Sequence, residues 1–130
     1  MRRILTTLFT MVATLCYAHA ANPEYVVLAS EGVNQDKVWC EVVETLAKKH
    51  DASVVVFNES PCEAMESLRK VNPRYVAIVD MPENIGRDYV IDFHHVSRDI
   101  DDDIYADFMW GIITGYDAEA AMRMVENSTE

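Results

Sequence analysis

Strand-length apolar runs alternate with amphipathic segments along most of this chain, and this alternation constrains the fold more than any other feature. Residues 24–30, 52–57 and 74–80 are apolar runs rich in β-branched residues, without the polar alternation of a half-exposed strand. Residues 37–50 and 61–71 instead place apolar side chains at a helical period. Strands and helices in this order predict βαβ units, and therefore a parallel sheet of buried strands with right-handed crossovers.

Local signals mark the ends of these elements. Ser60, Pro61 and Glu63 form a capping box with proline at the first helical position. Asn72 precedes Pro73, which disfavours the helical conformation and ends that helix. Residues 32–36 provide a turn between the first strand and the first helix.

The second half of the chain continues the pattern. Residues 89–100 predict a third helix and residues 106–113 a fourth strand, in which Gly111 marks a point of close approach. Asp117 then caps a final helix over residues 118–126. We therefore expect one α/β domain over residues 21–130, a three-layer α/β/α arrangement with about four mainly parallel strands.

Residues 1–20 have the pattern of a secretory signal peptide. Two arginines precede a short apolar stretch, and Ala18-His19-Ala20 supplies the small residues that signal peptidase requires. Cleavage after Ala20 predicts an exported protein, periplasmic or extracellular. No later apolar run approaches the roughly 20 residues of a membrane span.

Acidic side chains dominate the charge. The chain has a formal net charge of -11, and loss of Arg2 and Arg3 with the signal peptide leaves 9 basic against 22 acidic side chains, or -13. Such a surface repels phosphate backbones, which argues against nucleic acid and anionic membranes as partners. Cations or a basic protein surface fit better. Solubility alone is the favoured explanation of the charge, because net charge governs solubility rather than fold.

The predicted mature chain keeps two cysteines, Cys40 within a helix and Cys62 at the start of the next. Their separation permits a disulfide, and two free, partly buried thiols are the favoured alternative. The spacing lacks a zinc-binding pattern. A mid-helix Cys40 has a raised pKa, which is the opposite of an activated nucleophile, so we predict no catalytic residue.

Polar residues follow the predicted strands, where ligands bind in open parallel sheets. They form a polar rim without an evident nucleophile and base: Ser30, Glu31, Asn58, Glu59, Asp80 and Thr114. Neither the glycine-rich nor the lysine-containing pattern of a nucleotide site is present, so no cofactor is predicted.

Asp99, Asp101 and Asp103 have the alternate spacing that opens an EF-hand loop. Ile104 and Trp110 stand where that loop needs glycine and glutamate, which excludes an EF-hand. Two interpretations remain, a looser calcium site built from these three carboxylates or a solvated acidic loop. The adjacent His94 and His95 point about 100° apart on a helix and do not form a chelating pair.

The segment DDIYADFMWGIITG, residues 102–115, resembles exported gingipain-like proteins of peptidase family C25, in which an acidic D-x-Y-A-D segment precedes a glycine-containing apolar strand. The segment YVAIVDMP, residues 75–82, is similar to another strand of that family. The resemblance implies a caspase-like α/β fold. The catalytic histidine and cysteine of the family lie beyond later strands, and Ile112 stands where an arginine usually follows the strand glycine, so no catalytic residue is carried over.

The resemblance implies the leading, noncatalytic portion of a gingipain-like cysteine peptidase, either truncated or a stand-alone relative. Its partner would be a C-terminal catalytic portion or another protein. The alternative is a small periplasmic module with a flavodoxin-like sheet that binds a ligand, a cation or a protein. A third hypothesis is a structural domain stabilised by calcium.

Overall fold

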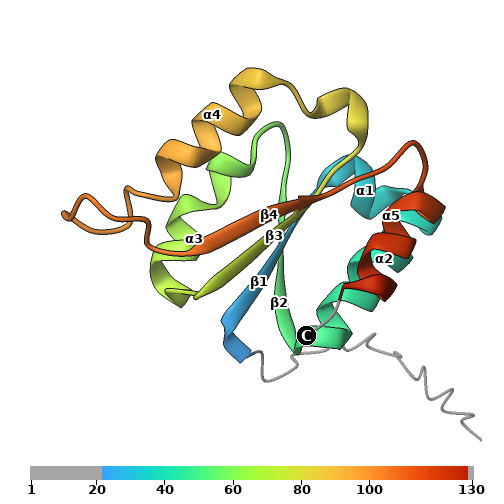
Figure 1. The fold of residues 1–130 in the computed structure, drawn as a ribbon, viewed down its shortest axis with the longest axis horizontal. Helices are drawn as coiled ribbons and strands as arrows, with labels where there is room; N and C mark the ends of the chain where they lie inside the picture. The colour runs from blue at the N-terminus through green and yellow to red at the C-terminus, as the bar shows by residue number, and fades with distance from the viewer. Residues whose placement is uncertain (1–21, 129–130) are drawn as a thin grey trace, which may run out of the picture.

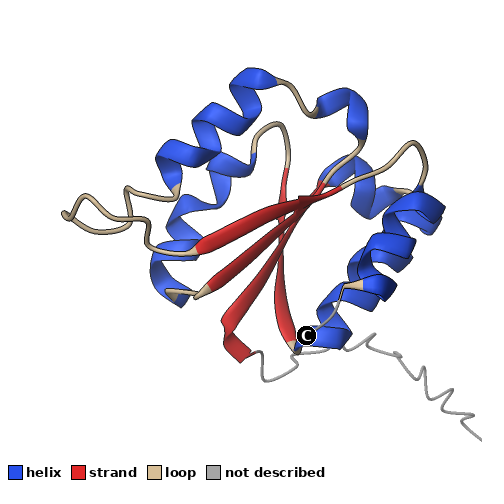
Figure 2. Ribbon diagram, in the orientation of Figure 1, coloured by secondary structure: helices blue, strands red, loops and turns tan. Residues whose placement is uncertain are grey.

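Four parallel strands form one sheet in the order β2-β1-β3-β4 (Figures 1 and 2). The computed structural model describes residues 22–128, so the predicted signal peptide lies outside the described residues. The strands are β1 (Asn22–Ser30), β2 (Ala52–Phe57), β3 (Tyr75–Val79) and β4 (Met109–Ile113). This arrangement confirms the predicted fold class, a three-layer α/β fold with four parallel strands.

Helices connect the strands and cover both faces of the sheet (Figure 2). They are α1 (Glu31–Gln35), α2 (Lys37–His50), the 3₁₀ helix η1 (Pro61–Ala64), α3 (Met65–Val71), the 3₁₀ helix η2 (Pro82–Asn84), α4 (Arg87–Val96) and α5 (Ala118–Asn127). The short helix α1 occupies the segment for which a turn was predicted. Its N-cap is Ser30, whose Oγ accepts the N–H of Val33.

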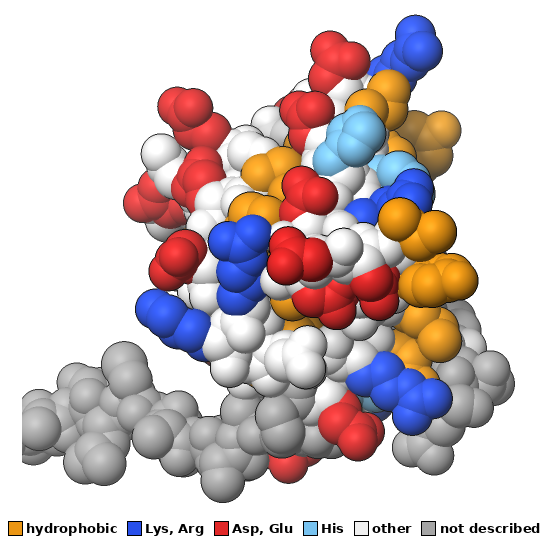
Figure 3. Space-filling model, turned by 90° about the vertical axis from the view of Figure 1, so that its left-hand side faces the viewer, with side chains coloured by type: hydrophobic (Ala, Val, Ile, Leu, Met, Phe, Trp, Pro, Cys, Tyr) orange, Lys and Arg blue, Asp and Glu red, His pale blue; other side chains and the backbone are white. Residues whose placement is uncertain are grey.

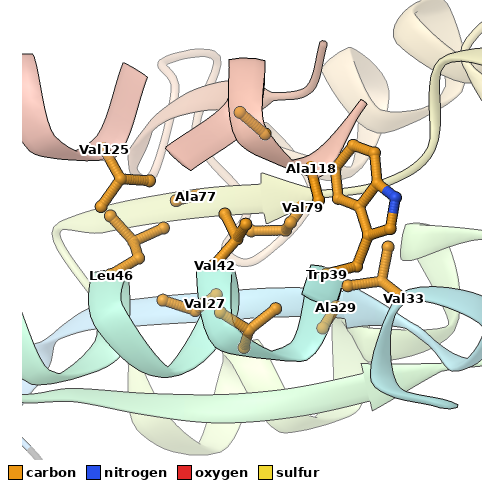
Figure 4. Close-up of a cluster of buried hydrophobic side chains, with 12 residues drawn as sticks. Val27, Ala29, Val33, Trp39, Val42, Leu46, Ala77, Val79, Ala118 and Val125 are labelled. Atoms are coloured by element: carbon orange, nitrogen blue, oxygen red, sulfur yellow. The ribbon is translucent and has the colours of Figure 1, made fainter. Parts of the chain in front are cut away.

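Two hydrophobic clusters fill the layers on opposite faces of the sheet. The α2–α5 cluster packs Trp39, Val42 and Leu46 of α2 against Val125 of α5 and against the sheet (Figure 4). The α3–α4 cluster lies on the other face, where its largest fully buried side chain is Phe93 of α4. Successive residues of β1 enter the two clusters alternately, because neighbouring side chains of a strand point to opposite faces.

The predicted helix signals are confirmed. Ser60 Oγ accepts the N–H of Cys62, and the Glu63 carboxylate accepts the N–H of Ser60, completing the capping box. Asn72 ends α3 in the left-handed conformation, with φ of 51°, directly before Pro73. Asp117 Oδ1 accepts the N–H of Ala120 and so caps α5.

Burial of the edge strands differs from the prediction. β1 and β3 are covered on both faces, but Val54 and Val56 of β2 are 43% and 47% exposed, and Met109 of β4 is 62% exposed. The reason is that helices cover the two central strands fully and the outer strands only in part.

The predicted close approach at Gly111 is wrong for residues 22–128, since none of their atoms outside the neighbouring residues lies within 4 Å of where its Cβ would be. Within residues 22–128, no helix has the length and apolar character needed to cross a membrane.

Candidate functional site

The carboxyl ends of the four strands meet at one edge of the sheet and bring the predicted polar rim together. In an open α/β sheet, the crevice for a ligand lies where the crossovers diverge. Here the connection after β1 leads to one side of the sheet and the connection after β3 to the other, so this point lies between Ser30 and Asp80. Both side chains are buried.

The Asp80 side chain lies in this crevice, where it bonds to groups of its own chain. Only 1% of the residue is exposed, and its carboxylate accepts three hydrogen bonds. Oδ1 accepts the N–H of Met81 and the side-chain N–H of Asn84, both at 2.8 Å, and Oδ2 accepts the hydroxyl of Tyr89 at 3.0 Å. These bonds compensate for the loss of water around a buried carboxylate. Asp80 therefore holds η2 and α4 onto the end of β3.

Tyr89 supplies the longest-range of these bonds. Burial, and next the negative charge of Asp80, raise the pKa of Tyr89 far above its usual range. The phenol therefore stays protonated and acts as a fixed donor to Asp80. Tyr89 was predicted as an apolar-face residue of the helix, and the only sequence signal for its polar role is its position in the first turn of a helix that follows Asp80.

The other rim residues have mixed roles. Ser30 is used as the cap of α1, and Glu31 is exposed. Asn58 and Glu59 lie in the exposed loop after β2. Thr114 follows β4, and its Oγ1 is buried without a hydrogen-bond partner among the described residues.

A hollow of about 350 Å³ opens at the carboxyl ends of β1 and β2, one strand away from the Asp80 crevice. This displacement has a physical cause, because the side chains of Asn84 and Tyr89 occupy the crevice itself. The residues around the hollow include two carboxylates and three amides but no lysine, arginine or histidine: Glu31, Asn34, Gln35, Val56, Phe57, Asn58 and Glu63. We call it the β1–β2 hollow.

Glu63 shapes one wall of the β1–β2 hollow. Its carboxylate accepts the backbone N–H groups of Asn58, Glu59 and Ser60 at 2.9 to 3.0 Å. These three bonds stabilise the ionised form and lower the pKa of Glu63 below its usual range. Glu31, also beside the hollow, accepts a hydrogen bond from Gln35 at Oε1. The lining therefore combines two carboxylates, of which Glu63 is held by three backbone N–H groups, with the apolar side chains of Val56 and Phe57.

The acidic loop between α4 and β4 is ordered by its own carboxylates. Asp101 Oδ1 accepts the N–H of Asp103, and Asp103 Oδ1 accepts the N–H of Tyr105. The backbone oxygen of Asp99 accepts a bond from Arg69. Within residues 22–128, no three acidic, histidine or cysteine side chains are arranged to hold a metal ion. Calcium at Asp99, Asp101 and Asp103 stays a prediction.

The two cysteines are free and partly buried, as the favoured interpretation predicted. Cys40 belongs to α2 on one face of the sheet, whereas Cys62 packs against the α3–α4 cluster on the other. Burial and the neighbouring carboxylates of Glu44 and Glu41 raise the pKa of Cys40, which confirms the predicted direction.

His94 and His95 are both exposed on α4, with ring centroids 6.2 Å apart. α4 packs on the face opposite α2, so neither histidine lies beside Cys40. At the carboxyl edge, the described residues thus present carboxylates held by hydrogen bonds and a hollow, and no nucleophile beside a base.

Comparisons with family models, curated proteins and solved structures found no match to this chain.

Proposed function

We propose that this chain is a noncatalytic, exported binding module that holds an organic cation, a primary amine or guanidinium on a short apolar stem, in the β1–β2 hollow. One observation carries the proposal: among residues 22–128, two carboxylates and three amides line the hollow without any basic side chain. A cation gains from both charges, and the apolar stem gains from contact with Val56 and Phe57. The volume falls within the usual range for small-ligand sites.

Chemistry at the edge supports binding rather than catalysis. Asp80 is committed to three internal donors, and Glu63 to three backbone N–H groups. Groups held in this way position a loop but do not exchange protons with a substrate. The signal-peptide pattern of residues 1–20 supports a site outside the cytoplasm.

Titration with butylguanidinium, followed by amide ¹H–¹⁵N spectra, tests the proposal. We expect shift changes at residues 31–35 and 56–63. Glu31→Gln should weaken binding about fivefold, because an exposed charge pair contributes about 1 kcal/mol. Glu126→Gln is the matched control, since it makes the same charge change in the last turn of α5. Shift changes spread over the whole acidic surface, or equal effects of the two variants, would contradict a specific site.

A second candidate is the leading, noncatalytic portion of a gingipain-like cysteine peptidase. The observation that favours it is the outer edge of β4, to which no strand is added within residues 22–128 and which a further strand could extend. The test is the gene sequence beyond the codon for Glu130. A continuing frame with a His-Gly segment and a later cysteine is the expected result, and a stop codon there would reject the truncated form and leave only a stand-alone relative.

A further inference from the structure

The two carboxylates of the β1–β2 hollow differ in how much of their hydrogen-bonding capacity is still open. Glu63 Oε1 accepts the N–H groups of Glu59 and Ser60. Its Oε2 accepts the N–H of Asn58. An ionised carboxylate has about four lone-pair positions, two on each oxygen, so Oε1 is full and Oε2 keeps one position. Glu63 therefore contributes charge to the hollow but cannot hold a ligand through both oxygens.

Glu31 keeps both of its oxygens available. Its Oε1 accepts one bond, from Nε2 of Gln35 at 2.9 Å, and among residues 22–128 no hydrogen bond reaches its Oε2. The residue is exposed at the start of α1. Of the two carboxylates, only Glu31 can therefore accept two parallel N–H groups at once, one on each oxygen.

The amide side chains of the hollow add acceptors that are also open. Asn34, Gln35 and Asn58 each have a side-chain carbonyl oxygen, and none of these oxygens accepts a hydrogen bond from residues 22–128. Gln35 already uses its Nε2 in the bond to Glu31, so its oxygen is the atom left for a ligand. An alkylguanidinium carries more N–H donors than an ammonium and holds them in one plane. It can therefore bond to both oxygens of Glu31 and to an amide together.

The apolar side chains beside these acceptors favour the same cation. Val56 is 47% exposed, and the buried Phe57 adjoins it in the lining. An ammonium is a compact and strongly hydrated charge, whereas a guanidinium is weakly hydrated and has flat faces that tolerate apolar contact. Contact with Val56 therefore costs a guanidinium less hydration than it costs an ammonium.

We infer that the β1–β2 hollow selects a guanidinium over a primary amine of the same charge and stem, and that Glu31 is the residue that sets this preference. This preference rests on the proposed function, because it names which of the two cations the hollow binds. Glu31 accepts two N–H groups from one edge of the guanidinium, and Glu63 adds charge and one further acceptor. Butylguanidinium should bind about fivefold more tightly than butylammonium, which cannot make the paired bonds.

The overall negative charge of the protein does not produce such a preference. Acidic side chains are also spread over the face of α3, α4 and the acidic loop, which Figure 3 shows, and they attract any cation. Butylguanidinium and butylammonium have the same charge and the same stem, so this attraction is nearly equal for both. The ratio of their dissociation constants therefore reports the paired bonds rather than the charge.

Parallel titrations of the chain from Ala21 onward, which contains every described element, measure this ratio through amide ¹H–¹⁵N spectra. Shift changes at residues 31–35 and 56–63 are expected for both ligands, with butylguanidinium about fivefold tighter. Equal affinities, or tighter binding of butylammonium, would overturn the guanidinium preference and leave the proposed cation site in place. Binding of neither ligand would reject the proposed function itself.

The guanidinium could belong to a free small molecule or to an arginine residue of a protein. Val54 lies two residues before Val56 on the same face of β2 and is 43% exposed, so a peptide attached to the guanidinium would contact it. An acetylated and amidated Gly-Arg-Gly peptide separates the two sources. Binding tighter than that of butylguanidinium, with shift changes extending to residues 52–55, supports a protein arginine. Weaker binding without those changes supports a free small molecule.

Variants test the role of Glu31. Glu31→Gln leaves one acceptor oxygen at this position, so butylguanidinium should weaken about fivefold and butylammonium only about twofold, which lowers the ratio from about five to about two. Glu126→Gln, in the last turn of α5, makes the same charge change and should leave the ratio unaltered. A ratio that survives Glu31→Gln, or that falls equally with Glu126→Gln, would overturn the assignment of the preference to Glu31.

Discussion

Substituting Gly115 by alanine gives the sharpest test of how α5 is joined to the sheet. An added Cβ would lie 2.7 Å from the Cβ of Ala120, 2.9 Å from the backbone nitrogen of Ala121 and 3.0 Å from the backbone oxygen of Asp117. Two of these three atoms are backbone, so side-chain rotation cannot relieve the overlap. The first turn of α5 has to move away from the end of β4.

The expected decrease in the free energy of unfolding has two parts. Overpacking of this kind costs about 1–3 kcal/mol. Movement of the first turn also strains the 2.8 Å bond between Asp117 Oδ1 and the N–H of Ala120, and a lost N-cap costs about 1 kcal/mol. Together they predict a decrease of roughly 2–4 kcal/mol in the free energy of unfolding, or a Tm lower by roughly 10–20 °C.

Urea and thermal unfolding followed by circular dichroism measure this loss. Gly32→Ala is the matched control, because a Cβ there meets nothing within 4 Å and helix α1 should gain from alanine. A Gly115→Ala protein within about 0.5 kcal/mol of the wild type would refute the reasoning, since surface substitutions vary by that amount without any steric cause.

Two further predictions concern the carboxyl edge. Tyr89→Phe removes one of three donors to the buried Asp80 carboxylate and should lower the free energy of unfolding, measured in urea titrations, by about 1.5 kcal/mol. Tyr116→Phe is the control, because Tyr116 is fully exposed and its substitution should not change the free energy of unfolding. Equal effects of the two variants would show that the Tyr89 phenol does not support Asp80. Because the pKa of Glu63 is lowered in the folded state, its stabilisation is complete above the unfolded pKa of about 4.3 and is lost as pH falls through the folded pKa. The difference in urea midpoint between the wild type and Glu63→Gln should therefore shrink from pH 7 toward about pH 3, and a difference independent of pH would contradict the role of the ionised carboxylate.

The order of strands and helices was predictable because each boundary has a strong local signal. Ser60, Pro61 and Glu63 specify a helix start through bonds within four residues, and Asn72 before Pro73 specifies a stop. Exposure of β2 and β4 was not predictable in this way. The apolar pattern around Val54 would be the same with or without a covering helix. Coverage depends on elements far away in the sequence.

The candidate site was predictable in part for the same reason. Parallel strands end at one edge, so the positions of Asp80 and Glu31 followed from the strand pattern. The hydrogen bond from Tyr89 to Asp80 depends on the orientation of α4 relative to the carboxyl ends of the strands, and no local sequence pattern specifies that orientation. Helix α1 was read as a turn because its five residues are too few to show a helical period and include Gly32.

The alternating side chains of β1 have a consequence for how this molecule comes apart. Val27 belongs to the α2–α5 cluster and the neighbouring Leu28 to the α3–α4 cluster, while the backbone between them pairs with β2 on one side and β3 on the other. Neither half can melt while the other keeps its packing, because both lose the same strand. The protein should therefore unfold in one cooperative step, with the amides of β1 opening only when the whole domain does.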